Sequence, residues 1–472
     1  MPNRGSFFIV ALCMLMGSLT PGGRLAAQSF AYLAAGDWRG HVEPCGCDPE
    51  TDVGGIRRFA DLVVKERSIR PKLSVFLLGN ISDYEMSAEG LAKARLILQA
   101  LKKLDTDAIL FNEAEKQLWK KHASLRRGLR TLPFVLSQTS GKPEDASIAD
   151  YRLLPTAMVM GFVSSDIKRE TPQLPSLLKR WKSLLKRHGK SRKRIMLFSG
   201  SESDLKVIRS SGLFDSILRS SPESLKDWQM PIVKSELGLI TNADDGGCEV
   251  IQVPIAGRGV VRGGDLVGRE APSLKEVLGL EGGRCKNADS SPLDCSFRPT
   301  LAVSRITWLS NKYSNSPLLD KAYAEYQRGT KNLFYQWAKS REKNLKASPY
   351  AGSAACQGCH AKAYESWLRS KHSRAFQILV DQNKHQDLAC VSCHVLGFHK
   401  KGGFVSLEKS PRFAHVNCEN CHGPRLSHVQ NPIKHKGDAS HARGVCVSCH
   451  QGEHSPKFEF AAYWNRIKHG HD

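Results

Sequence analysis

The sequence predicts an α/β domain followed by a mostly α-helical and irregular domain of a different composition. From residue 30 to about residue 261, short β-rich apolar runs alternate with amphipathic stretches of helical spacing, which is the pattern of an α/β fold. After Ala351 the composition changes, because this last quarter holds 14 of the 17 His and 8 of the 14 Cys. It also has too few Val, Ile and Leu to build an ordinary core.

The overall composition excludes a wholly disordered or fibrous protein. The chain has 472 residues, of which 41% are hydrophobic and 24% are charged, close to an ordinary globular protein. Its formal net charge is +23. A charge of this sign steers a protein toward acidic partners or anionic surfaces.

Residues 1–27 are predicted to be an export signal. An apolar run at residues 6–19 is followed by Pro-Gly-Gly and the small residues Ala26 and Ala27. The alternative is a retained membrane anchor, but the run is shorter than the roughly 18 apolar residues that a spanning helix needs. No later stretch is long and apolar enough. We therefore expect a periplasmic or extracytoplasmic protein with no membrane span.

Residues 28–316 are expected to form the α/β domain. The expected strands are residues 30–35, 74–78, 108–111, 133–137, 157–163, 195–199 and 250–254. The expected helices are residues 55–66, 88–104, 114–126, 173–187 and 202–211. A Gly-rich stretch at 257–287 indicates hairpins and loops, and Cys285 and Cys295 flank a loop that a disulfide could close.

A long helical linker is expected next, over residues 317–349. Apolar and aromatic residues recur among many charges up to Ala347, and Ser348-Pro349 ends the helix. The composition changes at this point, so residues 350–472 are predicted to be a separate domain. Something other than aliphatic side chains must fill its core.

The motif Cys-x-x-Cys-His occurs four times after residue 350. The thiols are Cys356 and Cys359, Cys390 and Cys393, Cys418 and Cys421, and Cys446 and Cys449, and the His residues are His360, His394, His422 and His450. This is the attachment motif for c-type haem. Two thiols one helical turn apart reach the two vinyl groups of one porphyrin, and the next His becomes the proximal iron ligand. The sequence predicts four covalently attached c-type haems.

Structural zinc is the alternative for Cys-x-x-Cys pairs. Zinc does not require a His at the same offset after every pair, and eight thiols in an exported protein would more usually form disulfides. Four haems would also fill the missing core. Their propionates would approximately cancel the charge of residues 350–472, which hold 16 Lys and Arg against 9 Asp and Glu.

Distal ligands decide between electron transfer and catalysis, because a sixth ligand closes the iron to small molecules. Ten His in this region lie outside the motifs. The best distal candidates are His372, after Trp367 on an expected short helix, His415, His428 and His469. The alternative for each is a surface His or one that bonds a propionate.

The C-terminal quarter resembles the tetrahaem cytochrome c-554 family. The resemblance rests on Tyr350-x-Gly352 before the first motif, Trp367-x-x-Ser370-x-His372, Cys418-Glu-x-Cys421-His422-Gly423-Pro424 with His428, and Ser455-Pro456-x-Phe458 with Trp464 and His469. It implies closely packed haem pairs, mostly ligated by two His, that pass single electrons. In that family, which is known from ammonia-oxidising bacteria, the electrons come from hydroxylamine oxidoreductase, and one haem can lack a distal side chain.

The N-terminal part resembles a 5′-nucleotidase-type metallophosphoesterase. The resemblance rests on a strand followed by Gly36-Asp37-Trp38-Arg39-Gly40-His41, and on Gly54-Gly55-Ile56. It implies an α/β sandwich with two metal ions. Most of the ligands that the resemblance implies are replaced, since Arg39 stands for a His, Asn80 for an Asp, Asn112-Glu113 lacks the adjacent His, and Ser199-Gly200-Ser201 stands where a His is expected. We therefore expect a degenerate domain with a docking or scaffolding role.

Cys45 and Cys47 are a separate question. With one residue between them they cannot easily pair with each other, so a disulfide would need Cys248, Cys285 or Cys295. The alternative is a redox or metal-binding thiol pair that faces the C-terminal domain.

The sequence as a whole predicts an exported tetrahaem protein that transfers single electrons between redox partner proteins. Because the N-terminal domain stays basic, we expect those partners to have acidic docking surfaces, and we do not expect nucleic acid. Two alternatives remain: a haem enzyme that acts on a small nitrogen or oxygen compound at an open iron, and a phosphohydrolase with a cytochrome tail.

Overall fold

A computed structural model describes most of the chain between Phe30 and His469. The described residues are 30–36, 38–44, 52–82, 87–137, 145, 147–164, 171–220, 249–252, 259–264, 305–436, 442–450, 455 and 457–469. The expected export signal lies outside them, as do Asp37, Cys45, Cys47, Cys248, Cys285 and Cys295. One compact unit comprises Tyr32–Arg262 and Ser304–Asp472. It contains the described helices and the described strands, apart from the ends of two of those strands.

The first sheet has six strands in the order β11-β10-β1-β2-β3-β4. Strands β1 to β4 run parallel, with Leu33 opposite Val75 and Phe76 opposite Ala108, whereas β10 and β11 pair antiparallel. The bounds are β1 (Ala31–Ala35), β2 (Ser74–Leu77), β3 (Ala108–Leu110), β4 (Phe134–Val135), β10 (Gly259–Gly264) and β11 (Arg305–Trp308). The parallel strands β2, β3 and β4 are buried along their whole length, as expected for strands covered on both faces.

The second sheet has five strands in the order β5-β6-β7-β8-β9. Strand β5 pairs antiparallel with β6, and the other neighbours are parallel. The bounds are β5 (Tyr151–Leu153), β6 (Ala157–Val163), β7 (Lys193–Ser199), β8 (Ser216–Arg219) and β9 (Glu249–Gln252). All seven expected strands are present, and the short strands β5 and β8 were not expected.

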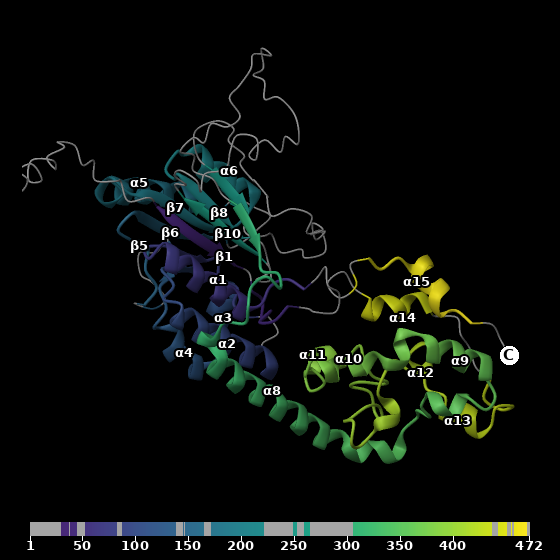
Figure 1. Cartoon of the computed structure of the whole chain (residues 1–472). Helices are drawn as coiled ribbons and strands as arrows, with labels where there is room; N and C mark the ends of the chain where they lie inside the picture. The colour runs from purple at the N-terminus through teal and green to yellow at the C-terminus, as the bar shows by residue number, and fades with distance from the viewer. Residues whose placement is uncertain are drawn as a thin grey trace, which may run out of the picture. The chain divides into compact units, whose positions relative to one another are not determined.

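Amphipathic helices flank these sheets (Figure 1). They are α1 (Ile56–Ile69), α2 (Ala88–Lys103), α3 (Glu113–Lys121), α4 (Ala123–Leu129), α5 (Leu174–His188) and α6 (Glu202–Ser210). In α5 the buried residues are Leu174, Leu177, Trp181 and Leu185, which is one stripe at helical spacing. The predicted α/β class is therefore confirmed.

One expected helix is divided in two. Residues 114–126 were expected to form a single helix, but His122 has φ −125° and ψ 83°, which ends α3 and starts α4. The change of direction lets α4 bury Leu125 and Leu129. Local spacing did not show the break because both halves have helical periodicity.

The expected linker contains α8 (Asp320–Arg341), which is continuous over its 22 residues (Figure 1). Its first half contacts α2, where Lys103 Nζ donates to the Leu318 carbonyl just before the helix at 2.8 Å. Further along, Phe334 is buried in an apolar cluster with Phe376, Val391 and Phe413 of the C-terminal region. One helix therefore supplies core residues to both parts of the chain.

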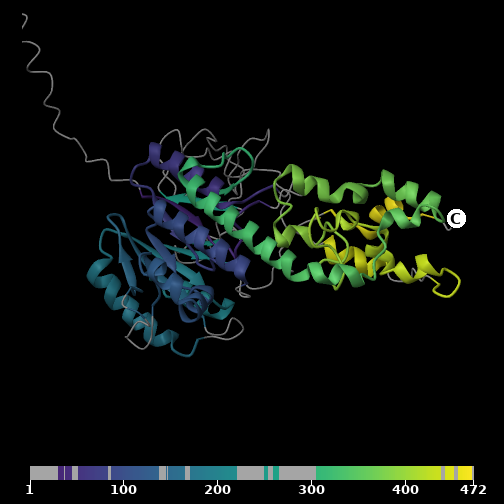
Figure 2. The ribbon, with the colours of Figure 1, turned by 90° about the horizontal axis from the view of Figure 1, so that it is seen from below.

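In its described residues, the C-terminal region consists of short helices and loops, as predicted (Figure 2). The α-helices are α9 (Ala361–Arg369), α10 (Ala375–Asp381), α11 (Leu388–Val391), α12 (Cys418–His422), α13 (Leu426–Gln430), α14 (Ala442–Cys449) and α15 (Phe460–Ile467). Many of the apolar side chains of these helices, such as Leu368 and Val447, are exposed to solvent. No described helix is long and apolar enough to cross a membrane.

A buried carboxylate joins the loops that follow β2 and β3. Glu115 on α3 is fully buried and accepts hydrogen bonds from the backbone N–H groups of Asn80 (3.1 Å), Ile81 (2.8 Å) and Asn112 (3.0 Å). Burial raises the pKa of Glu115 to about 7 from its ordinary value of 4.5, although the three N–H groups favour the carboxylate. Gly79 is required here, because a Cβ would lie 2.5 Å from the Leu110 carbonyl oxygen.

The buried Glu115 predicts how stability depends on pH. A carboxyl group whose pKa is raised in the folded state binds more protons there than in the unfolded state, so the free energy of unfolding should fall as the pH rises from about 4.5 to about 7. Urea unfolding of the full chain at several pH values, followed by circular dichroism, measures this. Glu115→Gln should remove that component of the pH dependence, whereas Glu113→Gln at an exposed position should retain it. Equal pH dependence in both variants would contradict the assignment.

Candidate haem-attachment site

Each Cys-x-x-Cys-His motif lies on a helix or on the turn that continues from one. In the first and fourth motifs the His N–H donates to the carbonyl of the first Cys at 2.9 Å, from His360 to Cys356 and from His450 to Cys446. The third motif is α12 itself, and the second follows from α11, where His394 N–H donates to the Val391 carbonyl at 3.0 Å. A helical turn brings both thiols and the His of one motif to the same region.

Three motif His rings each face a His from elsewhere in the chain. The ring centroids of His360 and His428 are 6.3 Å apart, those of His372 and His450 are 6.1 Å apart, and those of His422 and His469 are 5.8 Å apart. Metal–imidazole bonds of about 2 Å place the centres of two opposed rings about 6 Å apart. These centroid distances are therefore the ones that an iron held between the two rings of each pair would require.

The hydrogen bond that a His ring makes at Nδ1 determines which of its two nitrogens has a lone pair free to bind a metal. His394 Nδ1 lies 2.5 Å from the Ala375 carbonyl oxygen, and His428 Nδ1 lies 2.7 Å from that of His435. A carbonyl oxygen only accepts, so both rings carry their proton on Nδ1 and leave the Nε2 lone pair free for a metal.

His415 has the opposite arrangement. Its Nδ1 accepts the Phe376 N–H at 3.1 Å, so a neutral ring carries its proton on Nε2 and has no lone pair there to bind iron. Within the part of the chain that the structure describes, His394 has no ring contact with another His. Of the four distal candidates, His372, His428 and His469 therefore lie opposite a motif His, and His415 is held as an acceptor for the backbone. Three further His of the C-terminal region lie outside the described residues, namely His441, His454 and His471.

The attachment cysteines bring the motifs together in pairs. The Cys356 thiol hydrogen bonds to Cys418, which lowers the pKa of Cys418 to about 6, and the Cys449 thiol hydrogen bonds to Cys393. Cys421 and Cys446 are close enough to interact electrostatically. Contacts between cysteines thus connect the motifs in the order first, third, fourth, second.

Buried polar groups fix the first motif against the third. Glu419, inside the third motif, is 2% exposed, and its carboxylate accepts from the N–H groups of Ala351 (3.0 Å), Gly352 (2.7 Å) and Arg425 (2.7 Å). Asn417 Oδ1 accepts from the N–H of Ser353 at 3.0 Å. Sequence reasoning did not identify these roles, although the acidic residue between two attachment cysteines was visible.

The replaced metal ligands of the N-terminal domain have structural contacts. Asn80 adopts φ 51° and donates its backbone N–H to Glu115, while Asn112 accepts the Glu113 N–H at 2.9 Å and caps α3. His122 divides α3 from α4, and His188 stacks on Tyr151. Among the described residues, no group of three or more His, Cys, Asp or Glu is placed to hold a metal ion.

Comparison with known proteins supports the C-terminal resemblance. Residues 355–423 match the family model for cytochrome c554 and c-prime. Cytochrome c-554 of Nitrosomonas europaea is 34% identical over 136 residues, which are 22% of this chain and 58% of that protein. The chain thus spans less than two thirds of the length of this relative.

The N-terminal part has low-scoring likenesses among solved structures. The 5′-nucleotidase precursor of Thermus thermophilus has a TM-score of 0.43 and 15% identity, and covers 64% of this chain and 58% of its own. The calcineurin-like phosphoesterase YfkN of Bacillus subtilis has a TM-score of 0.38 and 15% identity, and covers 64% of this chain and 97% of its own.

The contacts of Glu419 predict a loss of stability in Glu419→Gln. The Gln side chain turns one acceptor atom into a donor that faces backbone N–H groups, which should cost about 1–3 kcal/mol of the free energy of unfolding. Thermal unfolding of the C-terminal region, followed by haem absorbance, measures this. Glu365→Gln, at an exposed acid on α9, is the matched control and should unfold as the wild type does. Equal stability of the two variants would show that the Glu419 contacts contribute nothing.

Proposed function

We propose that this chain is an exported electron carrier that holds four covalently attached c-type haems in residues 350–472. The proposal rests on three pairs of His rings. Each pair joins a motif His and a His from elsewhere in the chain, and the two ring centroids lie 5.8–6.3 Å apart. Bound haem supplies one-electron chemistry at iron. The match to the cytochrome c554 and c-prime model over residues 355–423 supports the same function.

The ligands that we propose follow from the ring pairs. His360, His394, His422 and His450 bind iron on the proximal side, and distal ligation comes from His428 for the first motif, His469 for the third and His372 for the fourth. We leave His415 out of this set because its Nδ1 accepts a backbone N–H. Pairs of His ligands keep small molecules from the iron, which favours electron transfer.

The second motif suggests a second candidate function. With His394 as its ligand and no opposed His among the described residues, an iron held there would have a side open to a small molecule. This observation favours the alternative of a haem enzyme that acts on a small nitrogen or oxygen compound. Both functions use the same electron path, so they differ only in what happens at the second motif.

The N-terminal domain is proposed to act in docking and scaffolding. The Oδ1 atom of Asn112 caps α3 by accepting the Glu113 N–H, which supports a role without metal catalysis, and Asn80 and Asn112 also donate their backbone N–H groups to Glu115. On α5, four exposed cations without an acid in the helix give this domain a basic face: Lys179, Lys182, Lys186 and Arg187. We propose that this face docks acidic redox partners outside the cytoplasm.

Ligand binding tests the proposed iron ligation. In the reduced, haem-loaded chain, carbon monoxide should shift the spectrum of one haem in four, because the other three irons have two His ligands. His428→Ala should add a second haem that binds carbon monoxide. His435→Ala, which removes an exposed ring and keeps the carbonyl that bonds His428, should leave the number at one. No shift in the wild type, or a shift unchanged by His428→Ala, would contradict the assignment.

Salt dependence tests the docking proposal. The rate at which a small acidic flavoprotein donor reduces the chain should fall as the ionic strength rises, since screening weakens attraction between exposed charges. Replacement of Lys179, Lys182 and Lys186 by Glu should slow the reaction at low salt. Replacement of the exposed Lys400 and Lys401 of the C-terminal region by Glu is the comparison. A stronger effect from the replacement of Lys400 and Lys401 would place docking on the C-terminal region instead.

A further inference from the structure

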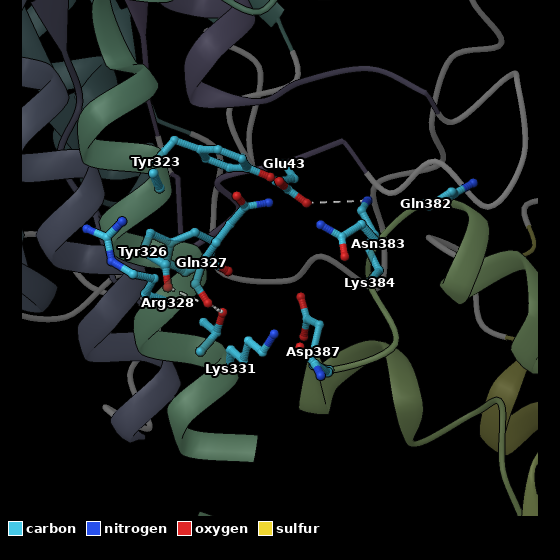
Figure 3. Close-up of a pocket in the computed structure, with 13 residues that line it drawn as sticks. Glu43, Tyr323, Tyr326, Gln327, Arg328, Lys331, Gln382, Asn383, Lys384 and Asp387 are labelled. Carbon is cyan, nitrogen blue, oxygen red and sulfur yellow. Dashed lines mark hydrogen bonds and ion pairs between the residues drawn. The ribbon is translucent and has the colours of Figure 1, made fainter. Parts of the chain in front are cut away.

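The second and fourth motifs are held by contacts of different kinds. Lys384, which precedes the second motif, lies with its Nζ 3.4 Å from Glu43 Oε2, and Figure 3 shows these two side chains pointing toward each other. Within the motif, His394 Nδ1 lies 2.5 Å from a backbone oxygen, that of Ala375. A substitution at Ala375 would leave this carbonyl in place, because every residue has one. The partner of His394 Nδ1 is therefore part of the main chain.

His450 of the fourth motif has a side-chain partner instead. Its Nδ1 lies 3.0 Å from Ser455 Oγ, and both residues are half-buried. An imidazole that binds iron through Nε2 carries its ring proton on Nδ1, so here the ring donates and the hydroxyl accepts. The acceptor at Nδ1 is thus a group that a single substitution can remove, keep or replace by a stronger one.

Two aromatic rings hold the same imidazole in its orientation. Phe458 stacks on His450, with the ring centroids 4.9 Å apart and the planes 8° apart, and Tyr463 of α15 meets it edge-on at 5.3 Å. The Phe458 N–H donates to the Ser455 carbonyl at 2.9 Å, so one turn brings both the hydroxyl and the Phe458 ring to His450. Rotation of the imidazole about its Cβ–Cγ bond would break this stacking. The Nδ1 atom therefore stays directed at the hydroxyl while His372 lies opposite, 6.1 Å from the ring centroid.

A hydrogen bond at Nδ1 changes how strongly the imidazole donates to a metal through Nε2. An acceptor that draws the Nδ1 proton toward itself makes the ring a more basic ligand. A more basic ligand stabilises ferric iron more than ferrous iron, so the reduction potential falls. A hydroxyl is a neutral acceptor, whereas hydrogen bonds to a carboxylate are about twice as strong. The residue at position 455 can therefore move the potential in either direction.

We propose that Ser455 is a positioning residue that acts through His450 and sets the reduction potential of the iron at the fourth motif. The inference rests on the proposed electron-transfer function. Helix α14, which holds the fourth motif, contacts α12, which is the third motif. An iron at the fourth motif would therefore exchange electrons with its neighbour at the third, and the difference between their potentials favours one direction of transfer. Ser455 contributes to that difference.

Redox titration of the full, haem-loaded chain tests the proposal with three substitutions at one position. Ser455→Ala removes the acceptor, so the reduction equilibrium constant of one haem in four should rise about threefold to tenfold, which corresponds to about 30–60 mV for a one-electron couple. Ser455→Asp supplies a charged acceptor and should lower the same constant by at least as large a factor. Ser455→Thr keeps the hydroxyl and should leave the constant within about twofold of the wild type.

The distal ligand identifies which step belongs to the fourth motif. In the proposed ligation, His372→Ala opens that iron, so carbon monoxide should raise the potential of two steps in this variant and of one step in the wild type. The additional step should be the one that the Ser455 variants move. Ser340→Ala, which removes an exposed hydroxyl on α8, is the matched control and should leave all four steps unchanged.

Two outcomes overturn the inference and leave the proposed function standing. One is a shift of the same sign in Ser455→Ala and Ser455→Asp, because a merely structural disturbance does not follow the strength of the acceptor. The other is unchanged potentials in both variants. In either case four haems would still titrate reversibly, whereas a chain without redox-active haem would overturn the proposed function itself. If Ser455→Asp fails to load haem, the other two variants decide, because the inference requires a rise in Ser455→Ala and the wild-type potential in Ser455→Thr.

Discussion

The separation between opposed His rings is the constraint on which the C-terminal region depends. Each pair must stay near 6 Å while its members come from distant parts of the sequence, such as His360 and His428. Short helices alone cannot hold such distances, because they have little core of their own. The carboxylate of Glu419 and the amide of Asn417 hold the first motif against the third, and the apolar cluster around Phe376 and Phe413 anchors the region to α8. Buried hydrogen bonds to the backbone therefore position the His residues that are proposed as ligands.

The sequence was sufficient for the fold class, for seven of the strands and for the four Cys-x-x-Cys-His motifs, but it did not indicate β5, β8 or β11. The apolar runs between the helical stretches located seven strands, because buried parallel strands are short and almost wholly apolar. It was not sufficient for the division at His122, since both α3 and α4 have helical spacing. Among distal candidates, the sequence does not reveal that Phe376 donates to His415, because that contact depends on the tertiary fold.

The N-terminal domain acquires a physical role from its contacts. Residues where the resemblance implies metal ligands, Asn80 and Asn112, are engaged by Glu115, so the carboxyl ends of β2 and β3 are closed by hydrogen bonds. Its contribution to the region around the second motif is a contact, in which Lys384 Nζ lies 3.4 Å from Glu43 Oε2 of the loop after β1. Because the attachment cysteines link the motifs in the order first, third, fourth, second, that contribution acts at one end of the order. A basic domain that docks a partner and also contacts the region of the terminal motif would bring docking and electron transfer together within one chain.

The central claim is that three irons have two His ligands and the fourth has one. Electron paramagnetic resonance of the oxidised, haem-loaded chain tests it most directly, because low-spin and high-spin ferric haem give separate signals. The account predicts three low-spin centres and one high-spin centre. Four low-spin centres would contradict it, since His394 would then have a partner that the described residues do not provide. More than one high-spin centre would show that at least one of the pairs His360–His428, His372–His450 and His422–His469 does not hold iron.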